Sequence, residues 1–234
     1  MIVKATGLKP RRMFRVGKRF YRTIKLAVRD SKNVIRFGPS APRFAEIFWV
    51  NPMDCDRYLA LALFRQQLGI TRQQARARVL TTPWPQEHVQ KITELSLFKN
   101  CYRRWVEGLS WAETGEYERM EELIREDPRG ISHGCRNRAD IIRRCENLDR
   151  IFKMASQEGR LRSSSEIDPA HDWSAREMLV HVGPGGLLYK GGEGMHRFAI
   201  AYILKISFPA NFGCVHVSAI ADLDRLRANK PAKF

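Results

Sequence analysis

The sequence predicts an α+β protein in which a small mixed sheet is joined to a helical region and a basic N-terminal helix. Apolar residues recur at helical spacing over much of the first two thirds of the chain. Short apolar segments bounded by Gly and Pro, which are typical of strands, are concentrated in the last third. At 234 residues the chain is long enough for one sizeable core, alone or with a substantial extension.

The positive charge is concentrated near the N-terminus. The net charge is +16, from 41 Lys and Arg against 25 Asp and Glu. Residues 1–43 hold thirteen of the basic residues and one acid, Asp30, which leaves 28 basic and 24 acidic residues for the rest of the chain. We therefore expect a basic extension on a mildly basic protein, and not a nucleic-acid-binding surface spread over the whole molecule.

Residues 11–29 are predicted to form a basic amphipathic helix. Its positive residues repeat on the face opposite to an apolar one. The apolar face consists of Met13, Val16, Phe20, Ile24 and Ala27. Three interpretations remain open: the helix lies on an anionic membrane surface, packs on the protein's own core, or neutralises the phosphates of a nucleic acid.

Composition also indicates a compartment. The five cysteines are scattered and odd in number, so they are expected to be free thiols in a reducing cytoplasm. No apolar run approaches the roughly 18–20 residues that span a bilayer, so any association with the membrane is expected to be peripheral, at its inner face.

The first two thirds are predicted to be mainly helical. Residues 30–44 contain Gly38 and Pro39 and are predicted to be a linker or an ordered loop, and residues 46–50 a buried strand. Helices are expected over residues 54–69, 71–80, 110–124 and 138–158, the last of them stopped by Gly159. In the last third we expect a hairpin of strands at 178–182 and 187–189, a helix at 196–205 and a strand at 214–220.

The segment 189–201 carries the clearest chemical signal, because a strand is predicted to run through glycines into a helix. Glycines let backbone N–H groups approach an anion closely, and a helix N-terminus adds free donors and a positive dipole end. Arg197 can grip phosphate oxygens, His196 can shuttle a proton, and Glu193 can hold a metal ion or accept a proton. The spacing matches neither a Walker A loop nor a Rossmann fingerprint, so a tight turn with Arg197 paired to an acid stays an alternative.

The run Glu-Gly-Met-His-Arg-Phe-Ala-Ile-Ala at residues 193–201 resembles the signature turn of the ParB/sulfiredoxin-like superfamily. The resemblance covers about residues 138–220, and a weaker likeness upstream points to a subgroup with a long helical insertion. It implies a ParB/sulfiredoxin-like domain at 46–224. Within the domain it implies a helical insertion at about 54–137 and a core at about 138–220. The charge distribution adds a basic amphipathic extension and linker before it (1–45) and a basic tail after it (225–234).

The same resemblance implies nucleotide chemistry. Members bind or use CTP or ATP, and some are kinases of free serine, so a nucleoside di- or triphosphate (ATP, ADP or CTP) and Mg²⁺ are the expected cofactors. Glu193, His196 and Arg197 would be catalytic, and Glu193 would hold the metal. The residues implied to contact phosphate are Gly192, Gly194, Met195, His196 and Arg197.

Two departures from the family pattern narrow the expected activity. Met195 stands where sulfiredoxins carry their catalytic cysteine within the loop, which disfavours repair of sulfinic acids. The loop lacks the Glu-Arg-Arg of ParB proteins, and the 37 residues after Arg197 contain no helix-turn-helix pattern, which disfavours DNA partition.

The expected function is transfer of a phosphoryl group from the nucleotide to a hydroxyl of a small-molecule or carbohydrate acceptor, or nucleotide hydrolysis. Two alternatives remain open: a nucleic-acid-binding or nuclease protein, and a nucleotide-gated interaction module without turnover.

Overall fold

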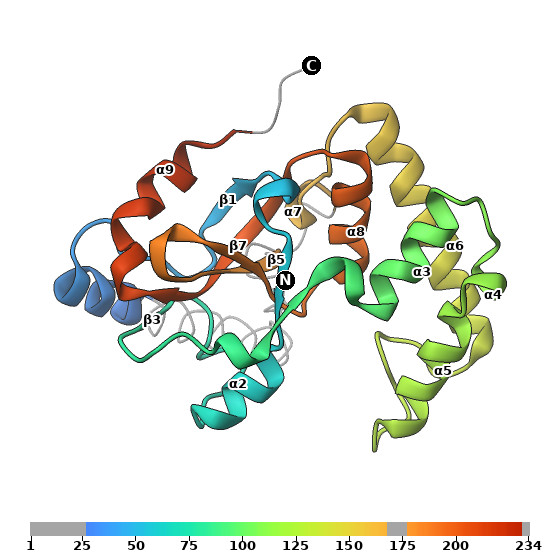
Figure 1. The fold of residues 1–234 in the computed structure, drawn as a ribbon, viewed down its shortest axis with the longest axis horizontal. Coiled ribbons are helices and arrows are strands. Elements are labelled where there is room, and N and C mark those ends of the chain that lie inside the picture. The colour runs from blue at the N-terminus through green and yellow to red at the C-terminus, as the bar shows by residue number, and fades with distance from the viewer. Residues whose placement is uncertain (1–26, 168–176, 231–234) are drawn as a thin grey trace, which may run out of the picture.

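The computed structural model describes residues 27–167 and 177–230, and it confirms the α+β class. A seven-stranded mixed sheet has the order β1-β7-β5-β6-β2-β4, and β3 also pairs with β7 (Figure 1). The strands are β1 (Ile47–Val50), β2 (Arg57–Leu59), β3 (Arg78–Leu80), β4 (Val89–Lys91), β5 (Met178–Val182), β6 (Leu188–Lys190) and β7 (Phe208–His216).

The centre of the sheet is the parallel pair of β5 and β7. All five residues of β5 are buried, as are the first eight of β7, so neither strand alternates between apolar and polar residues. Antiparallel β6 continues the sheet on the other edge of β5, and β2 runs parallel to β6. β1 and β3 pair with successive halves of β7, so they occupy the same edge of it.

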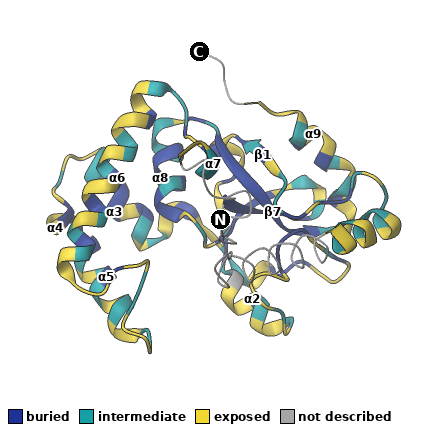
Figure 2. Ribbon diagram, turned by 180° about the vertical axis from the view of Figure 1, so that it is seen from behind, coloured by how far each residue is buried: buried dark blue, intermediate teal, exposed yellow. Residues whose placement is uncertain are grey.

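Helices cover the sheet and form a separate group at one end of the molecule (Figures 1 and 2). That group contains α3 (Ser96–Trp105), α4 (Trp111–Thr114), α5 (Glu116–Glu126) and α6 (Arg138–Glu158). The other helices are residues 27–37, α2 (Leu61–Gln67), α7 (Ser164–Ile167), α8 (Met195–Leu204) and α9 (Leu223–Ala228). Short 3-10 helices are Pro52–Asp54, Gln86–His88, Ile92–Glu94, Pro184–Gly186 and Val217–Asp222.

Helix α8 lies between the sheet and the helical group, and it contacts both α3 and α6. Its residues Phe198, Ala199, Ile200 and Ala201 are fully buried. Contact with the sheet on one side and with the helical group on the other explains why most residues of this helix are apolar, although its last three residues are only half-buried. The N-terminus of α8, where the glycine loop enters, is therefore fixed by the core.

The strongest local signals in the sequence are confirmed. Helix α6 covers residues 138–158, begins at an Asn137 side-chain cap and ends at Gly159, whose φ is +62°. The strand at 46–50, the hairpin of β5 and β6 and the helix that follows the glycine loop are also present. Within the described residues no helix is both long and apolar enough to cross a bilayer.

Three predictions for residues 30–80 were wrong in part. Residues 30–37 continue a helix, and the turn begins only at Gly38. Residues 54–69 contain strand β2 before the short helix α2. Residues 71–80 form a tight turn followed by β3, because Thr71 and Gln74 exchange side-chain hydrogen bonds and β3 pairs with β7. Pairing with a distant strand outweighs local helix propensity here.

Other boundaries also differ from the prediction. The helix expected at 110–124 is divided at Gly115, whose φ is +83°. The interval 54–137 is only partly helical, since it supplies β2, β3 and β4 to the sheet. The last strand begins at Phe208 and not at 214, and residues 217–222 are a 3-10 helix. Residues 11–26 of the predicted basic helix lie outside the described residues.

Candidate functional site

The loop of residues 191–194 connects the end of β6 to the start of α8. A Cβ atom on Gly191 would lie 2.8 Å from His181 Nε2, and one on Gly194 would lie 2.7 Å from Met178 Cγ. Gly194 also has a φ of +72°, a region that favours glycine. Gly192 and Gly194 are nevertheless exposed on their outer side. The loop is therefore packed tightly against β5 from below and open above.

The side chain of Lys190 lies beneath this loop and determines which way its peptide groups point. Lys190 is fully buried, and its Nζ donates to the carbonyl oxygens of Gly191, at 2.6 Å, and of Glu193. In a trans peptide the C=O and the following N–H point in opposite directions. The N–H groups of Gly192 and Gly194 therefore point away from the Lys190 amine, toward the exposed side of the loop.

Burial also changes the acidity of Lys190. It lowers the pKa of the amine from 10.5 to about 7, the Cys55 thiol and Glu193 raise it, and the positive charges of Arg197 and Arg76 lower it further. A neutral amine still carries two N–H groups, so both carbonyl oxygens keep their donor when the proton is lost.

Glu193 is held by two arginines from the turn before β3. Arg72 and Arg76 each donate to its carboxylate, and Arg76 also donates to Asn211 Oδ1 at 3.2 Å. The side chain of Glu193 is only 18% exposed, and its charge is compensated. Among the described residues no group of three or more His, Cys, Asp and Glu is placed to hold a metal ion. A metal at Glu193 would therefore have one protein carboxylate and would take its other ligands from phosphate and water.

His196 faces the helical group and not the open side of the loop. Its Nε2 lies 2.8 Å from Oε1 of the fully buried Glu116, which also accepts from Arg119 and Asn100. Burial raises the pKa of Glu116, but the hydrogen bonds from Arg119 and His196 outweigh it and bring the pKa to about 2. Burial lowers the pKa of His196, against the opposing effect of Glu116.

Arg197 is also engaged inside the protein. Its guanidinium donates to Ser164 Oγ at 3.2 Å, to Oε2 of the fully buried Glu177 at 3.4 Å, and to the carbonyl of Arg162 at 2.5 Å. Burial raises the pKa of Glu177, although Arg197 opposes this. Arg197 is therefore paired with an acid, which is the arrangement that the sequence left open as the alternative to phosphate binding by this residue. Arg197 joins α8 to α7 and to the start of β5.

The predicted site residues are thus neighbours in the fold, but they face different ways. Backbone groups of Gly192 and Gly194 lie at the open side of the loop, while Met195, His196 and Arg197 are directed inward or partly inward. The sequence indicated no role for Lys190, although this residue lies within the segment 189–201, and it did not identify Arg72 or Arg76 as parts of this region. No local pattern marks the two arginines, which lie more than 110 residues from Glu193 along the chain.

Comparisons of the chain with models of protein families, with curated proteins and with solved structures give no match. The geometry of the loop therefore carries the functional argument.

Proposed function

We propose that this protein binds the phosphates of a nucleoside di- or triphosphate, such as ATP, ADP or CTP, at the loop of residues 191–194. The observation that carries the proposal is the orientation of the Gly192 and Gly194 N–H groups away from Lys190. The two exposed glycines provide two outward N–H donors next to the N-terminus of a buried helix. Together they form an anion-binding site of the kind expected for a ParB/sulfiredoxin-like protein.

Two further features support phosphate binding. The first N–H groups of α8 have no partner within the helix, and its dipole places partial positive charge at that end. Arg72 lies beside the loop on Glu193, and its exposed guanidinium group suits phosphate oxygens, whereas the buried Arg76 holds Glu193 in place. Glu193 would hold Mg²⁺ together with the phosphates once the exposed Arg72 leaves its carboxylate for a phosphate oxygen, and the ion would neutralise the phosphate charge.

The activity that we propose is phosphoryl transfer to a hydroxyl of a small-molecule or carbohydrate acceptor. The bond from the terminal phosphorus to its bridging oxygen breaks, a bond to the acceptor oxygen forms, and the hydroxyl proton leaves to a base. The loop amides and an arginine stabilise the charge on the transferring group. In this proposal His196 and Arg197 hold α8 in place through Glu116 and Glu177, and the backbone contacts the phosphates.

A nucleotide-gated module without turnover is the second candidate function. The observation that favours it is the internal pairing of His196 and Arg197, which leaves the open side of the loop lined mainly by backbone groups. Such a module would bind nucleotide at the same loop and would not release ADP or a phosphorylated product.

A negative charge introduced at position 192 by substitution of Gly192 tests the binding proposal. This residue is exposed, lacks a positive φ, and a Cβ atom on it would have only Tyr58 Oη nearby, at 3.4 Å. Gly192→Asp places a carboxylate in the anion-binding site, and Gly192→Asn is the neutral control of nearly equal shape. Binding of ATP, ADP, CTP and GTP is measured by calorimetry in the presence of Mg²⁺. The nucleotide that binds should bind about tenfold more weakly to the Gly192→Asp variant than to the Gly192→Asn variant.

Equal affinity of the two variants, or no binding of any nucleotide to the unmodified protein, would contradict the site. Arg197→Ala is a poor test by itself, because it removes the partner of buried Glu177 and so disturbs the fold. Turnover is measured separately, by phosphorus NMR of the bound nucleotide with a panel of hydroxyl compounds. Binding without any change in the nucleotide would select the module over the phosphotransferase.

A further inference from the structure

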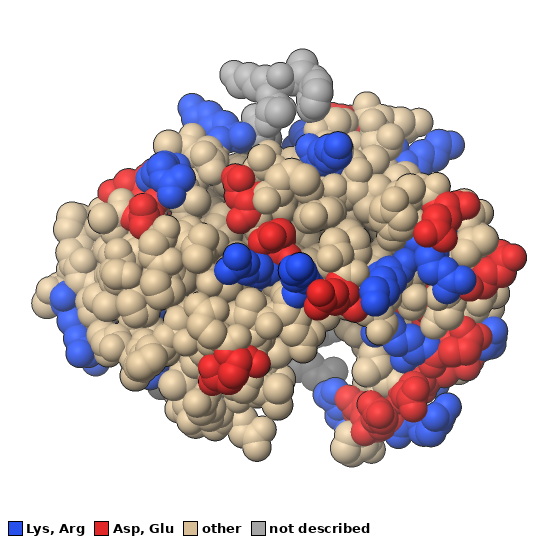
Figure 3. Space-filling model, in the orientation of Figure 1, with Lys and Arg blue, Asp and Glu red and all other residues tan. Residues whose placement is uncertain are grey.

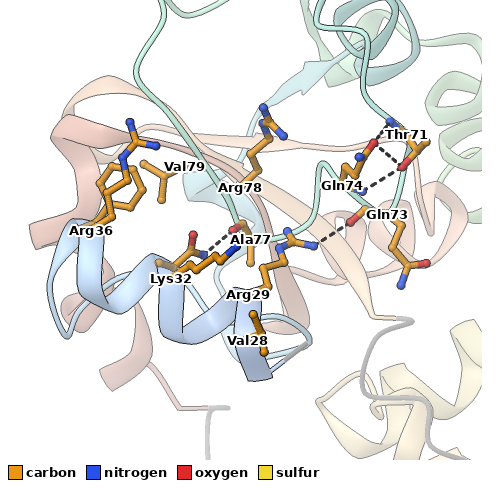
Figure 4. A pocket seen from close by; sticks show the side chains of 12 residues that line it. Val28, Arg29, Lys32, Arg36, Thr71, Gln73, Gln74, Ala77, Arg78 and Val79 are labelled. Carbon is orange, nitrogen blue, oxygen red and sulfur yellow. Dashed lines mark hydrogen bonds between the residues drawn. The ribbon is translucent and has the colours of Figure 1, made fainter. Parts of the chain in front are cut away.

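A second cationic feature lies apart from the glycine loop. A cavity of about 930 Å³ separates the helix at 27–37 from residues 71–79 (Figure 4). Its charged lining residues are Arg29, Lys32, Arg36 and Arg78, and we call it the basic groove. Within the described part of the chain its lining contains no Asp or Glu, and none of the four cations forms an ion pair. This differs from the face in Figure 3, where positive and negative side chains are intermixed.

The walls of the basic groove are held in place by polar contacts. Asn33 Nδ2 donates to the carbonyl of Ala77, and Arg29 Nη1 donates to the carbonyl of Gln73, at 2.9 and 3.1 Å. Both bonds tie the helix at 27–37 to the turn before β3. The groove is therefore built into the fold.

The surroundings of Arg29 indicate that the positive charge of the basic groove is not compensated by nearby acidic side chains. Its Nη2 is buried and has no hydrogen-bond partner, although buried polar atoms are normally paired. Burial lowers the pKa of Arg29, Asp30 raises it, the nearby positive charge of Arg78 lowers it, and the Cys214 thiol raises it. The Asp30 carboxylate accepts a hydrogen bond from the Phe44 amide. Like charges close together, with an unused donor, are typical of an anion site.

We propose that the basic groove binds the phosphodiester backbone of a single-stranded nucleic acid. Arg29, Lys32 and Arg36 are spaced three and four residues apart, so they follow one face of the helix over about 10 Å. A row of that length suits successive phosphates better than a single one. Phe37 and Val79 add apolar surface within the same cavity, and grooves that track single strands combine these features.

The sequence before the groove extends the same charge. Residues 1–26 contain nine Lys and Arg and no acid, and they lead directly into the helix that lines the groove. A membrane surface would engage an outward row of cations, whereas Arg29 and Lys32 lie on the side of the helix that faces Gln73 and Ala77 (Figure 4). The concave placement therefore favours a strand that enters the groove.

The test compares two variants of the full chain with the same loss of charge. Arg36→Gln with Arg78→Gln removes two exposed cations of the groove, and Arg136→Gln with Lys153→Gln removes two exposed cations from the helical group and the loop before it. Fluorescence anisotropy with a labelled 20-nucleotide single strand is measured from 50 to 300 mM salt. The groove variant should bind about tenfold more weakly at 50 mM salt. The slope of log affinity against log salt should become shallower by about 1.4, for two lost phosphate contacts.

Four results would overturn the proposal. One is no binding of the strand by the unmodified protein at 50 mM salt, and another is an equal effect of the two double variants. The third is a groove variant that binds the strand as the unmodified protein does but no longer binds phosphatidylserine vesicles, while the control variant still binds them. That result would show that the basic groove binds a membrane surface. Pyrophosphate is titrated as a competitor; displacement of the strand at equal phosphate concentration would show a site for a small anion instead.

Discussion

Replacement of Lys190 by Met should remove a rise in stability with pH that the unmodified protein shows near neutrality. The pKa of Lys190 is about 7 in the folded protein and 10.5 when the side chain is free in water. Between these values the unfolded chain holds a proton that the folded protein has released, so stability increases as pH rises. For one such group the free energy of unfolding should increase by about 2 kcal/mol from pH 6.5 to 8.5.

Urea unfolding at pH 6.5, 7.5 and 8.5 measures this increase. The informative quantity is the difference between the unmodified protein and Lys190→Met, because all other titrating groups are common to both. The buried thiols of Cys55, Cys145 and Cys214, whose pKa burial raises to about 12, oppose the increase at the alkaline end and cancel in that difference. Lys153→Met, at an exposed position of α6, is the control for loss of a lysine as such.

Identical pH dependence in Lys190→Met and the unmodified protein would refute the assignment of a strongly lowered pKa to Lys190. A second readout concerns the loop itself. Met has no donor for the carbonyl oxygens of Gly191 and Glu193, so the loop should be held less firmly. Amide hydrogen exchange should become faster at Gly191, which donates to the Leu179 carbonyl, and at Phe198, which donates to the Gly194 carbonyl. Unchanged exchange would show that Lys190 does not orient the loop.

Gly213→Ala would place a Cβ atom 2.3 Å from His181 Nδ1, so it should destabilise the fold by about 1–3 kcal/mol and lower the melting temperature. Glu116→Gln should weaken the acid dependence of stability: the pKa of Glu116 is lowered to about 2 in the folded state, so its contribution is present above pH 4.5 and is lost as pH falls toward 2. Acid titration of circular dichroism should therefore show a shallower loss for this variant, and an unchanged profile would contradict it. Arg197→Met should cost about 3–5 kcal/mol by leaving Glu177 unpaired, and adding Glu177→Leu should recover part of that loss in urea unfolding.

Local chemistry determined several parts of this fold directly from the sequence. Helix α6 follows from apolar spacing between a capping Asn137 and Gly159, and the passage from β6 through glycines into α8 follows from the same kind of local rule. These features depend on backbone conformations and on neighbours within a few residues, which a single sequence displays.

Only the tertiary structure decided where the side chains of the loop point. His196 finds Glu116 80 residues away, Glu193 finds Arg72 121 residues away, and no periodic pattern connects such partners. For the same reason residues 78–80 became a strand, since their hydrogen-bond partners are on β7. The sequence by itself determined that a glycine turn leads into a helix. The burial of Lys190 under that turn decided that the N–H groups of the loop face outward. A buried amine must donate hydrogen bonds to the nearest carbonyl oxygens, because leaving it without a partner in the core would be costly.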